Sequence, residues 1–447
     1  MSAAAPNTAG TGVSVPIGRY VAGVSDRFPR VTRNRMVEVS IASREKQDIL
    51  PVNILSDKSI DGSYLEFRVP GIVGRFLDLS SLALEMKVII TNEKKERLTP
   101  AQKAVFVDSP VNSMFRSVQV YLGDRLVESN GFYNYSSYIK LLTTFQKRNL
   151  DTLGIAGMLN VDYETEPSVY DAAHFADDDD ERMKRSKEAG AHVKFPLSLD
   201  IATLDQYLVD GIPLRIRLEL AGNPWIIGTA DDDPKYIVEM KEAKLWLDRL
   251  SPQPNALIAL NDSLSAPGKT LDYVFTRTLV RTFALSPNQN MAVLDLPWGQ
   301  VIPDRLYMVI QNLSNYSGTY NKNGLYFSNG RIERLQVTVN SVPIRTLYAT
   351  YPTEITQVYY DTLEAVGLTS DTLLTYEAFS NGKAVYVINL EGETLENALP
   401  VEKSGNLRIH LTFGEASDEN RVIFLFGDTL GVMGVDRDRT VTCDVRA

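Results

Sequence analysis

The stretch FRSVQVYLGDRLVESNGFYNYSSYIKLLTTFQ, residues 115–146, changes its apolar period halfway along. Apolar residues first alternate with more polar ones over 118–122, which predicts a strand with one buried face. Residues 123–124, Gly-Asp, are typical of a hairpin turn, because glycine tolerates positive φ. Beyond Asn134, which we expect to be an N-cap, apolar residues recur at helical spacing over 135–145. The stretch therefore predicts strand, turn, strand and amphipathic helix.

The same unit occurs a second time, 217 residues further along the chain. Residues 117–122 align with 334–339, and Asn-Ser at 340–341 takes the place of the first turn. A second amphipathic helix is expected within 353–366. Because all four elements recur in order, the sequence predicts two related domains in tandem.

Later strands repeat as well. Residues 214–220 and 407–413 both alternate apolar with charged or polar residues, and one more strand is expected after each. Many short strands separated by turn signals predict an all-β protein of two tandem eight-stranded jelly rolls, with short helices in loops. The expected organisation is a flexible N-terminal arm over 1–45, a first jelly roll over 46–252, a linker over 253–268 and a second jelly roll over 269–447.

Composition excludes several classes. The 447 residues carry a net charge of −10, which argues against a surface that binds nucleic acid throughout. The sequence contains no run of about 18 apolar residues, so it predicts no membrane-spanning helix. The N-terminus lacks the features of a secretory signal. The single cysteine, Cys443, is expected to be a packed side chain and fits a reducing compartment. We therefore expect a protein that is not secreted.

The residues suggest no catalytic or metal site. His174, His192 and His410 are far apart in sequence, so no clustered ligand set is visible. Residues 265–270, SAPGKT, end like a phosphate-binding loop, but a serine stands where its first glycine should be. The three tryptophans are expected in cores or interfaces. The prediction is a protein without enzymatic activity, cofactor or metal.

One segment is clearly basic, and it includes Arg27, Arg30, Arg33 and Arg35. The simpler interpretation is a solvated linker. The alternative is an arm that contacts nucleic acid or an acidic partner.

Three segments carry a resemblance to a known family: 113–145, 301–344 (VIPDRLYMVIQNLSNYSGTYNKNGLYFSNGRIERLQVTVNSVPI) and 405–426 (GNLRIHLTFGEASDENRVIFLF). The first resembles the strand, turn and helix of the double jelly-roll major capsid proteins of eukaryotic double-stranded DNA viruses. The other two are similar to the hexon-like proteins of Polinton (Maverick) elements and adintoviruses. The resemblance covers roughly residues 60–440 and leaves out the arm.

The resemblance implies a structural role in a virion. A member of this family forms homotrimers that act as pseudo-hexameric capsomers and tile an icosahedral shell. It implies neighbouring capsomers and minor capsid or penton proteins as partners, and synthesis in the host cytoplasm or nucleus. The four arginines of the arm would then lie inside the shell, near the genome or an inner membrane.

Two other functions compete with this one. A carbohydrate-binding or carbohydrate-active double β-sandwich is the main alternative, since jelly rolls also serve those functions. A minor or vertex capsid component is a third, but the internal repeat argues against a single jelly roll.

Overall fold

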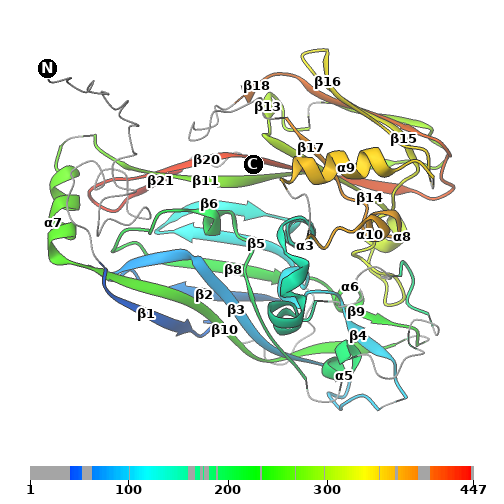
Figure 1. The fold of residues 1–447 in the computed structure, drawn as a ribbon. Coiled ribbons are helices and arrows are strands. Elements are labelled where there is room, and N and C mark those ends of the chain that lie inside the picture. Colours follow the sequence, from blue (N-terminus) through cyan, green and yellow to red (C-terminus); the bar gives the residue numbers. More distant parts are fainter. Residues whose placement is uncertain are drawn as a thin grey trace, which may run out of the picture.

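The structure, a computed structural model, describes residues 41–52, 63–99, 101–159, 167–171, 175, 181–187, 190–231, 234–266, 268–295, 297–351, 353–367, 371–390 and 403–443. The strands in this part of the chain gather in two sandwiches. Figure 1 shows them side by side, the first coloured from blue to green and the second from green to red.

The first sandwich has eight strands. They are β1 (Ile41–Ile49), β2 (Tyr64–Val69), β3 (Phe76–Asn92), β5 (Phe115–Leu122), β6 (Arg125–Asn130), β7 (Ala191–Pro196), β8 (Leu214–Leu220) and β10 (Tyr236–Pro252). They form two antiparallel sheets with the orders β1-β10-β3-β7 and β2-β8-β5-β6. The first, third, sixth and eighth strands thus share one sheet and the other four share the second, which is the jelly-roll arrangement.

The second sandwich repeats this topology strand for strand. Its strands are β11 (Leu271–Leu285), β12 (Met291–Asp295), β14 (Arg305–Asn312), β15 (Ile332–Val339), β16 (Val342–Tyr348), β17 (Tyr386–Asn389), β19 (Leu407–Phe413) and β20 (Arg421–Val435). The sheet orders are β11-β20-β14-β17 and β12-β19-β15-β16. The predicted pair of eight-stranded jelly rolls is therefore confirmed.

The other strands of the described residues are short. They are β4 (Ala104–Phe106), β9 (Ile227–Thr229), β13 (Val301–Ile302), β18 (Lys403–Ser404) and β21 (Val441–Cys443). The pairs β4-β9 and β13-β18 are separate ribbons, and β21 extends the second roll by pairing with β20.

The duplicated hairpin has the predicted form in both rolls. β5 pairs with β6 through a turn at Gly123, whose φ is 60°, and β15 pairs with β16 through Asn340 and Ser341, with φ of 51° and 68°. In the second hairpin the left-handed pair Asn340 and Ser341 gives a turn whose twist matches that of the flanking strands, whereas in the first only Gly123 has positive φ. The alternating apolar residues of β5 and β15 point into their sandwiches and are buried.

Helices occupy the connections. They are α2 (Pro110–Ser113), α3 (Tyr133–Thr144), η1 (Lys147–Asn149), η2 (Leu150–Gly154), α4 (Ile155–Gly157), α5 (Glu181–Lys187), η4 (Asp200–Thr203), α6 (Asn223–Ile226), α7 (Pro254–Ser263), α8 (Leu313–Tyr316), α9 (Thr356–Ala365) and α10 (Tyr376–Ser380). The two predicted amphipathic helices are α3 and α9, each of which joins the fifth strand of its roll to the sixth. None of the helices in the described ranges is both long and apolar enough to cross a membrane.

The predicted N-cap of α3 is wrong. Asn134 is the second residue of the helix, and Phe132, which has no polar side chain to cap it, occupies the N-cap position. The side chain of Asn130 instead accepts a hydrogen bond from the backbone N–H of Phe132, at 2.9 Å. A side-chain turn just before the helix therefore sets its start, where the sequence pattern favoured a residue inside it.

Two stretches predicted to be irregular contain helices. Residues 149–192 are loop-like in sequence, but they contain α5. This helix packs on β4, where Ser186 Oγ accepts a hydrogen bond from the Phe106 N–H at 3.2 Å. The expected linker over 253–268 is largely α7. Its first residue is Pro254, which the first turn of a helix tolerates, and it buries Ala256, Ala259 and Leu260 on one face.

The N-terminal boundary also differs. β1 begins at Ile41, inside the segment expected to be an arm over 1–45, and pairs along its length with β10. Most of its side chains are exposed, so the apolar alternation that reveals a half-buried strand is missing from its sequence. Residues 1–40 lie outside the described residues.

Candidate functional site: the junction between the two jelly rolls

The two rolls share one apolar core. The buried side chains of both sandwiches form a single contiguous cluster, and α3 lies where the two rolls meet (Figure 1). Because α3 belongs to the first roll and contacts strands of the second, it fixes their relative orientation. Three sets of contacts at this junction define the arrangement.

The first set is an aromatic cluster. The ring of Tyr135 on α3 stacks on that of Phe424 on β20, with centroids 4.4 Å apart, and its hydroxyl donates to Gln311 Oε1 at 3.0 Å. Trp225, from α6 of the first roll, meets Tyr135 edge to face at 5.9 Å. Tyr316, from α8 of the second roll, lies 5.6 Å from Phe424. Burial of such large rings contributes strongly to the stability of an interface.

Glycines of the second roll make room for Trp225. A Cβ atom added to Gly324 would lie 2.5 Å from Trp225 Nε1, and one added to Gly318 would lie 3.0 Å from its Cβ. No side chain fits at these distances without displacing its neighbour. The indole therefore docks directly against the backbone of the other roll.

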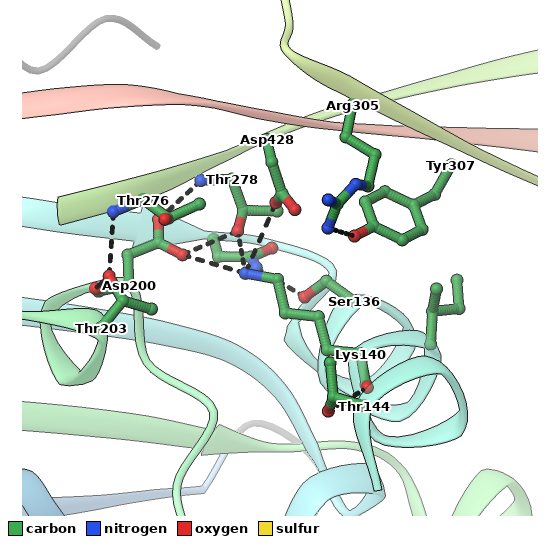
Figure 2. Close-up of polar contacts among 12 residues, drawn as sticks. Ser136, Lys140, Thr144, Asp200, Thr203, Thr276, Thr278, Arg305, Tyr307 and Asp428 are labelled. Atoms are coloured by element: carbon green, nitrogen blue, oxygen red, sulfur yellow. Dashed lines mark hydrogen bonds and ion pairs between the residues drawn. The ribbon is translucent and has the colours of Figure 1, made fainter. Parts of the chain in front are cut away.

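The second set is a buried polar cluster, drawn in Figure 2. Lys140 on α3 donates to Thr278 Oγ1 on β11, lies 3.4 Å from Asp200 Oδ1 and lies 3.8 Å from Asp428 Oδ1 on β20. The side chain of Lys140 is 22% exposed, and those of Asp200 and Asp428 are 7% and 15% exposed. Asp200 also accepts hydrogen bonds from Thr278 N at 2.9 Å and Thr278 Oγ1 at 2.7 Å. One ammonium group thus links an element of each roll.

The cluster shifts the titration of its members. Burial by itself would lower the pKa of Lys140, but Asp200 and Asp428 outweigh it and raise the pKa above its ordinary value. Burial, together with the nearby Asp200 carboxylate, raises the pKa of Glu128 well above its ordinary value. Glu128 Oε2 accepts the backbone N–H groups of Asp200 and Ile201, at 2.9 and 3.4 Å. The arrangement therefore disfavours the ionised form of Glu128 and favours the ionised form of the lysine.

The third set consists of an ion pair and hydrogen bonds between the rolls at the edges of the junction. Arg439 donates to Asp210 Oδ1 at 2.7 Å, and Arg125 donates to the carbonyl of Cys443 at 2.7 Å. The backbone N–H of Tyr170 donates to the carbonyl of Asn321 at 2.9 Å. With contacts along its whole length, the junction makes the two rolls a single block.

The sequence did not reveal these junction residues. Lys140 was part of the predicted helix, but its partners are 60, 138 and 288 residues away in the chain. Trp225 does lie at an interface, as expected. Cys443 is 5% exposed, which confirms a packed side chain, and within the described ranges no group of three or more His, Cys, Asp and Glu residues could hold a metal. The predicted site residues Arg27, Arg30, Arg33 and Arg35 lie outside the described residues.

The second roll has exposed apolar side chains on both edge strands of one sheet. Met291 and Val293 on β12 are 67% and 52% exposed, and Val342, Ile344 and Tyr348 on β16 are 59%, 47% and 57% exposed. We call these five residues the edge set. Within each strand these residues are an even number of positions apart and so lie on one side of it. Exposed apolar side chains that gather in this way can form a surface that meets another protein.

The fold matches solved structures of viral capsids. A chain of the Sputnik virophage matches with a TM-score of 0.58 and 11% identity, covering 91% of this chain and 89% of that one. The PBCV-1 capsid matches at 0.54 and 9% identity, with coverages of 91% and 97%. The mavirus major capsid protein matches at 0.50 and 13% identity, with coverages of 91% and 92%.

Sequence comparison gives no relative: no protein-family model and no curated protein matches the chain. The likeness to the capsid proteins is therefore carried by the order of the strands and not by shared residues. It extends over both sandwiches, as a coverage of 91% requires. The chain has the double jelly-roll fold of the major capsid proteins of double-stranded DNA viruses and virophages.

Proposed function

We propose that this protein is a major capsid protein that trimerises into a pseudo-hexameric capsomer and tiles an icosahedral virion shell. The observation that carries the proposal is the same eight-strand topology twice in one chain, locked into one block, in a fold like that of viral capsid proteins. Three chains with two similar rolls each would present six nearly equivalent sides around a threefold axis. A shell built of hexagonal blocks needs such sides.

The edge set is the best candidate for contacts between chains. An interface core needs apolar side chains that lose their exposure on assembly, and these five residues are exposed in the single chain. Edge strands also offer unpaired backbone groups to a neighbour. In this proposal they contact the first roll of the next chain or a neighbouring capsomer.

The arm completes the proposal. Arg27, Arg30, Arg33 and Arg35 would lie on the inside of the shell, against the genome, an inner membrane or a minor capsid or penton protein. The proposed organisation remains an arm, two jelly rolls and a linker, with β1 assigned to the first roll and α7 to the linker. Deletion of residues 1–36 should impair assembly or packaging, and unchanged particles with normal genome content would contradict this role.

The carbohydrate-binding alternative has no support from the comparisons, because the structures that resemble the chain are capsid proteins. The capsid proposal assigns structural work to the chain and no chemistry.

The solution mass of the purified chain tests the proposal. One chain is 49.8 kDa, so a trimer would be about 149 kDa by light scattering, and electron microscopy should show hexagonal blocks. The double variant Met291→Lys, Val293→Lys should shift the mass toward that of a monomer without unfolding the chain. The matched control is Glu242→Lys on β10, an exposed site that already carries a charge. A wild-type chain that stays monomeric and never forms particles with partner proteins would contradict the proposal.

A further inference from the structure

A pocket of about 400 Å³ opens at the junction of the rolls. The N-terminal end of α3, the segment 221–225 after β8 and the segment 316–318 at the end of α8 form its walls. Both rolls therefore contribute to it, so the pocket exists only in the joined structure. Its volume lies in the range typical of small-molecule sites.

Aromatic rings form much of the wall. Phe132 and Trp225 come from the first roll and Tyr316 from the second, and all three are partly exposed. Tyr135 is buried behind them, stacked on Phe424. Because the rings are held by this cluster, their exposed parts offer a preorganised surface for a flat, unsaturated group.

A buried carboxamide also lines the pocket. Asn134 is 4% exposed, and its Oδ1 accepts no hydrogen bond from the described residues. A buried polar atom without a partner costs free energy, so native structures leave few of them. Rotation of the side chain would turn this carboxamide, whose Oδ1 is closed off from solvent in the structure, toward the pocket, where it can pair with a ligand that has both a donor and an acceptor.

Arg116 supplies a cation to the same pocket. It stands at a β-bulge of β5, where the register with β8 shifts between Phe115 and Ser117. A bulge redirects a side chain from the regular alternation of the strand. Within the described ranges, no hydrogen bond or ion pair joins the exposed Arg116 guanidinium to another residue. The position 217 residues later, at the equivalent bulge of β15, is Glu333.

We propose that this pocket binds a nucleotide unit, with the base between the aromatic walls, its polar edge on the Asn134 carboxamide and its phosphate on Arg116. Stacking on aromatic side chains holds a base of any identity, asparagine forms paired hydrogen bonds with an adenine edge, and arginine binds phosphate in a forked geometry. The inference does not rest on the capsid function, since the pocket is complete within one chain. The unit could come from a free nucleotide or from single-stranded nucleic acid.

Isothermal titration calorimetry on the full chain at fixed salt tests the proposal. AMP should bind, adenosine and inorganic phosphate should each bind at least about tenfold more weakly, and Arg116→Gln should weaken AMP by about tenfold or more, as expected for a lost charged hydrogen bond. The matched control, Glu333→Gln, changes the charge at the equivalent bulge of the other roll and should leave AMP binding unchanged. Asn134→Leu should also weaken AMP, and its folding is checked by its unfolding midpoint.

Two further probes are used. One distinguishes a free nucleotide from single-stranded nucleic acid as the source of the unit, and the other, N-acetyltyrosine, competes with the nucleotide as a ligand. A pentanucleotide of deoxyadenosine that binds more tightly than AMP, and is equally sensitive to Arg116→Gln, would identify single-stranded nucleic acid as the source. AMP binding the more tightly of the two would identify the free nucleotide. No binding of either, equal binding by Arg116→Gln, or tighter binding of N-acetyltyrosine than of AMP would overturn the proposal.

Discussion

The ring of Tyr135 on α3 stacks on the ring of Phe424 on β20 with centroids 4.4 Å apart, although the two residues belong to different jelly rolls. This contact lies at the centre of the aromatic cluster between the rolls. It places the helix of one roll against a central strand of the other.

Replacement of Tyr135 by alanine should destabilise the whole chain. It removes a fully buried ring at the junction, so the free energy of unfolding should fall by about 3–5 kcal/mol in urea denaturation. The control is Tyr360→Ala, a residue that is 62% exposed and whose loss should change stability by less than about 0.5 kcal/mol. Similar small losses for both variants would show that the junction contributes little.

Removal of Lys140 should leave the carboxylates of Asp200 and Asp428 without the cation they share. Lys140→Met should lower the free energy of unfolding by about 3 kcal/mol, because removal of one partner of a buried ion pair leaves the other as an uncompensated buried charge. Adding Asp428→Asn to this variant should recover part of the loss. The exposed Lys87 on β3 provides the control, Lys87→Met, which should be close to neutral. A double variant no more stable than Lys140→Met would refute the coupling.

Glu128 should make stability fall as pH rises. Its pKa in the folded chain is raised well above the ordinary 4.5, so between these two values the folded state binds more protons than the unfolded state. Stability must then decrease with rising pH in that window. Glu128→Gln keeps an acceptor for the backbone N–H groups of Asp200 and Ile201 but does not titrate.

Thermal unfolding from pH 5 to pH 8 checks this sign. The melting temperature of Glu128→Gln should rise relative to that of the wild type as pH increases. The exposed-site control, Glu242→Gln, should keep a constant difference from the wild type. Parallel curves for Glu128→Gln and the wild type would contradict the raised pKa.

Gly324 should tolerate no side chain while Trp225 is present. A Cβ atom there would lie 2.5 Å from Trp225 Nε1, so Gly324→Ala should cost about 1–3 kcal/mol through overpacking. Trp225→Phe in the same chain should recover part of this loss. Gly131 has nothing within 4 Å of an added Cβ, and Gly131→Ala serves as the control, with no loss expected. Equal effects at both glycines would mean that Trp225 does not dock as described.

Sequence patterns predicted the elements that have a buried face. The alternation in β5 and β15 reflects one side packed in a sandwich, and the period of α3 and α9 reflects one side packed on a roll. The sequence pattern did not predict β1, because its side chains are mostly exposed and the strand is held by the pairing of its backbone with β10. The sequence predicted a linker in place of α7 because prolines cluster around it, although the one inside the helix, Pro254, lies in the first turn, where proline is accepted.

The sequence by itself determined the all-β class, the duplicated strand–turn–strand–helix unit and its jelly-roll division, because periodicity and turn chemistry are local properties of the chain. Only the tertiary structure decided how the rolls meet. Lys140 and Asp428 are 288 residues apart in the chain, and Arg116 shares a pocket with Ser317. Such pairings depend on the packing of distant strands, and no local pattern in a single sequence records them.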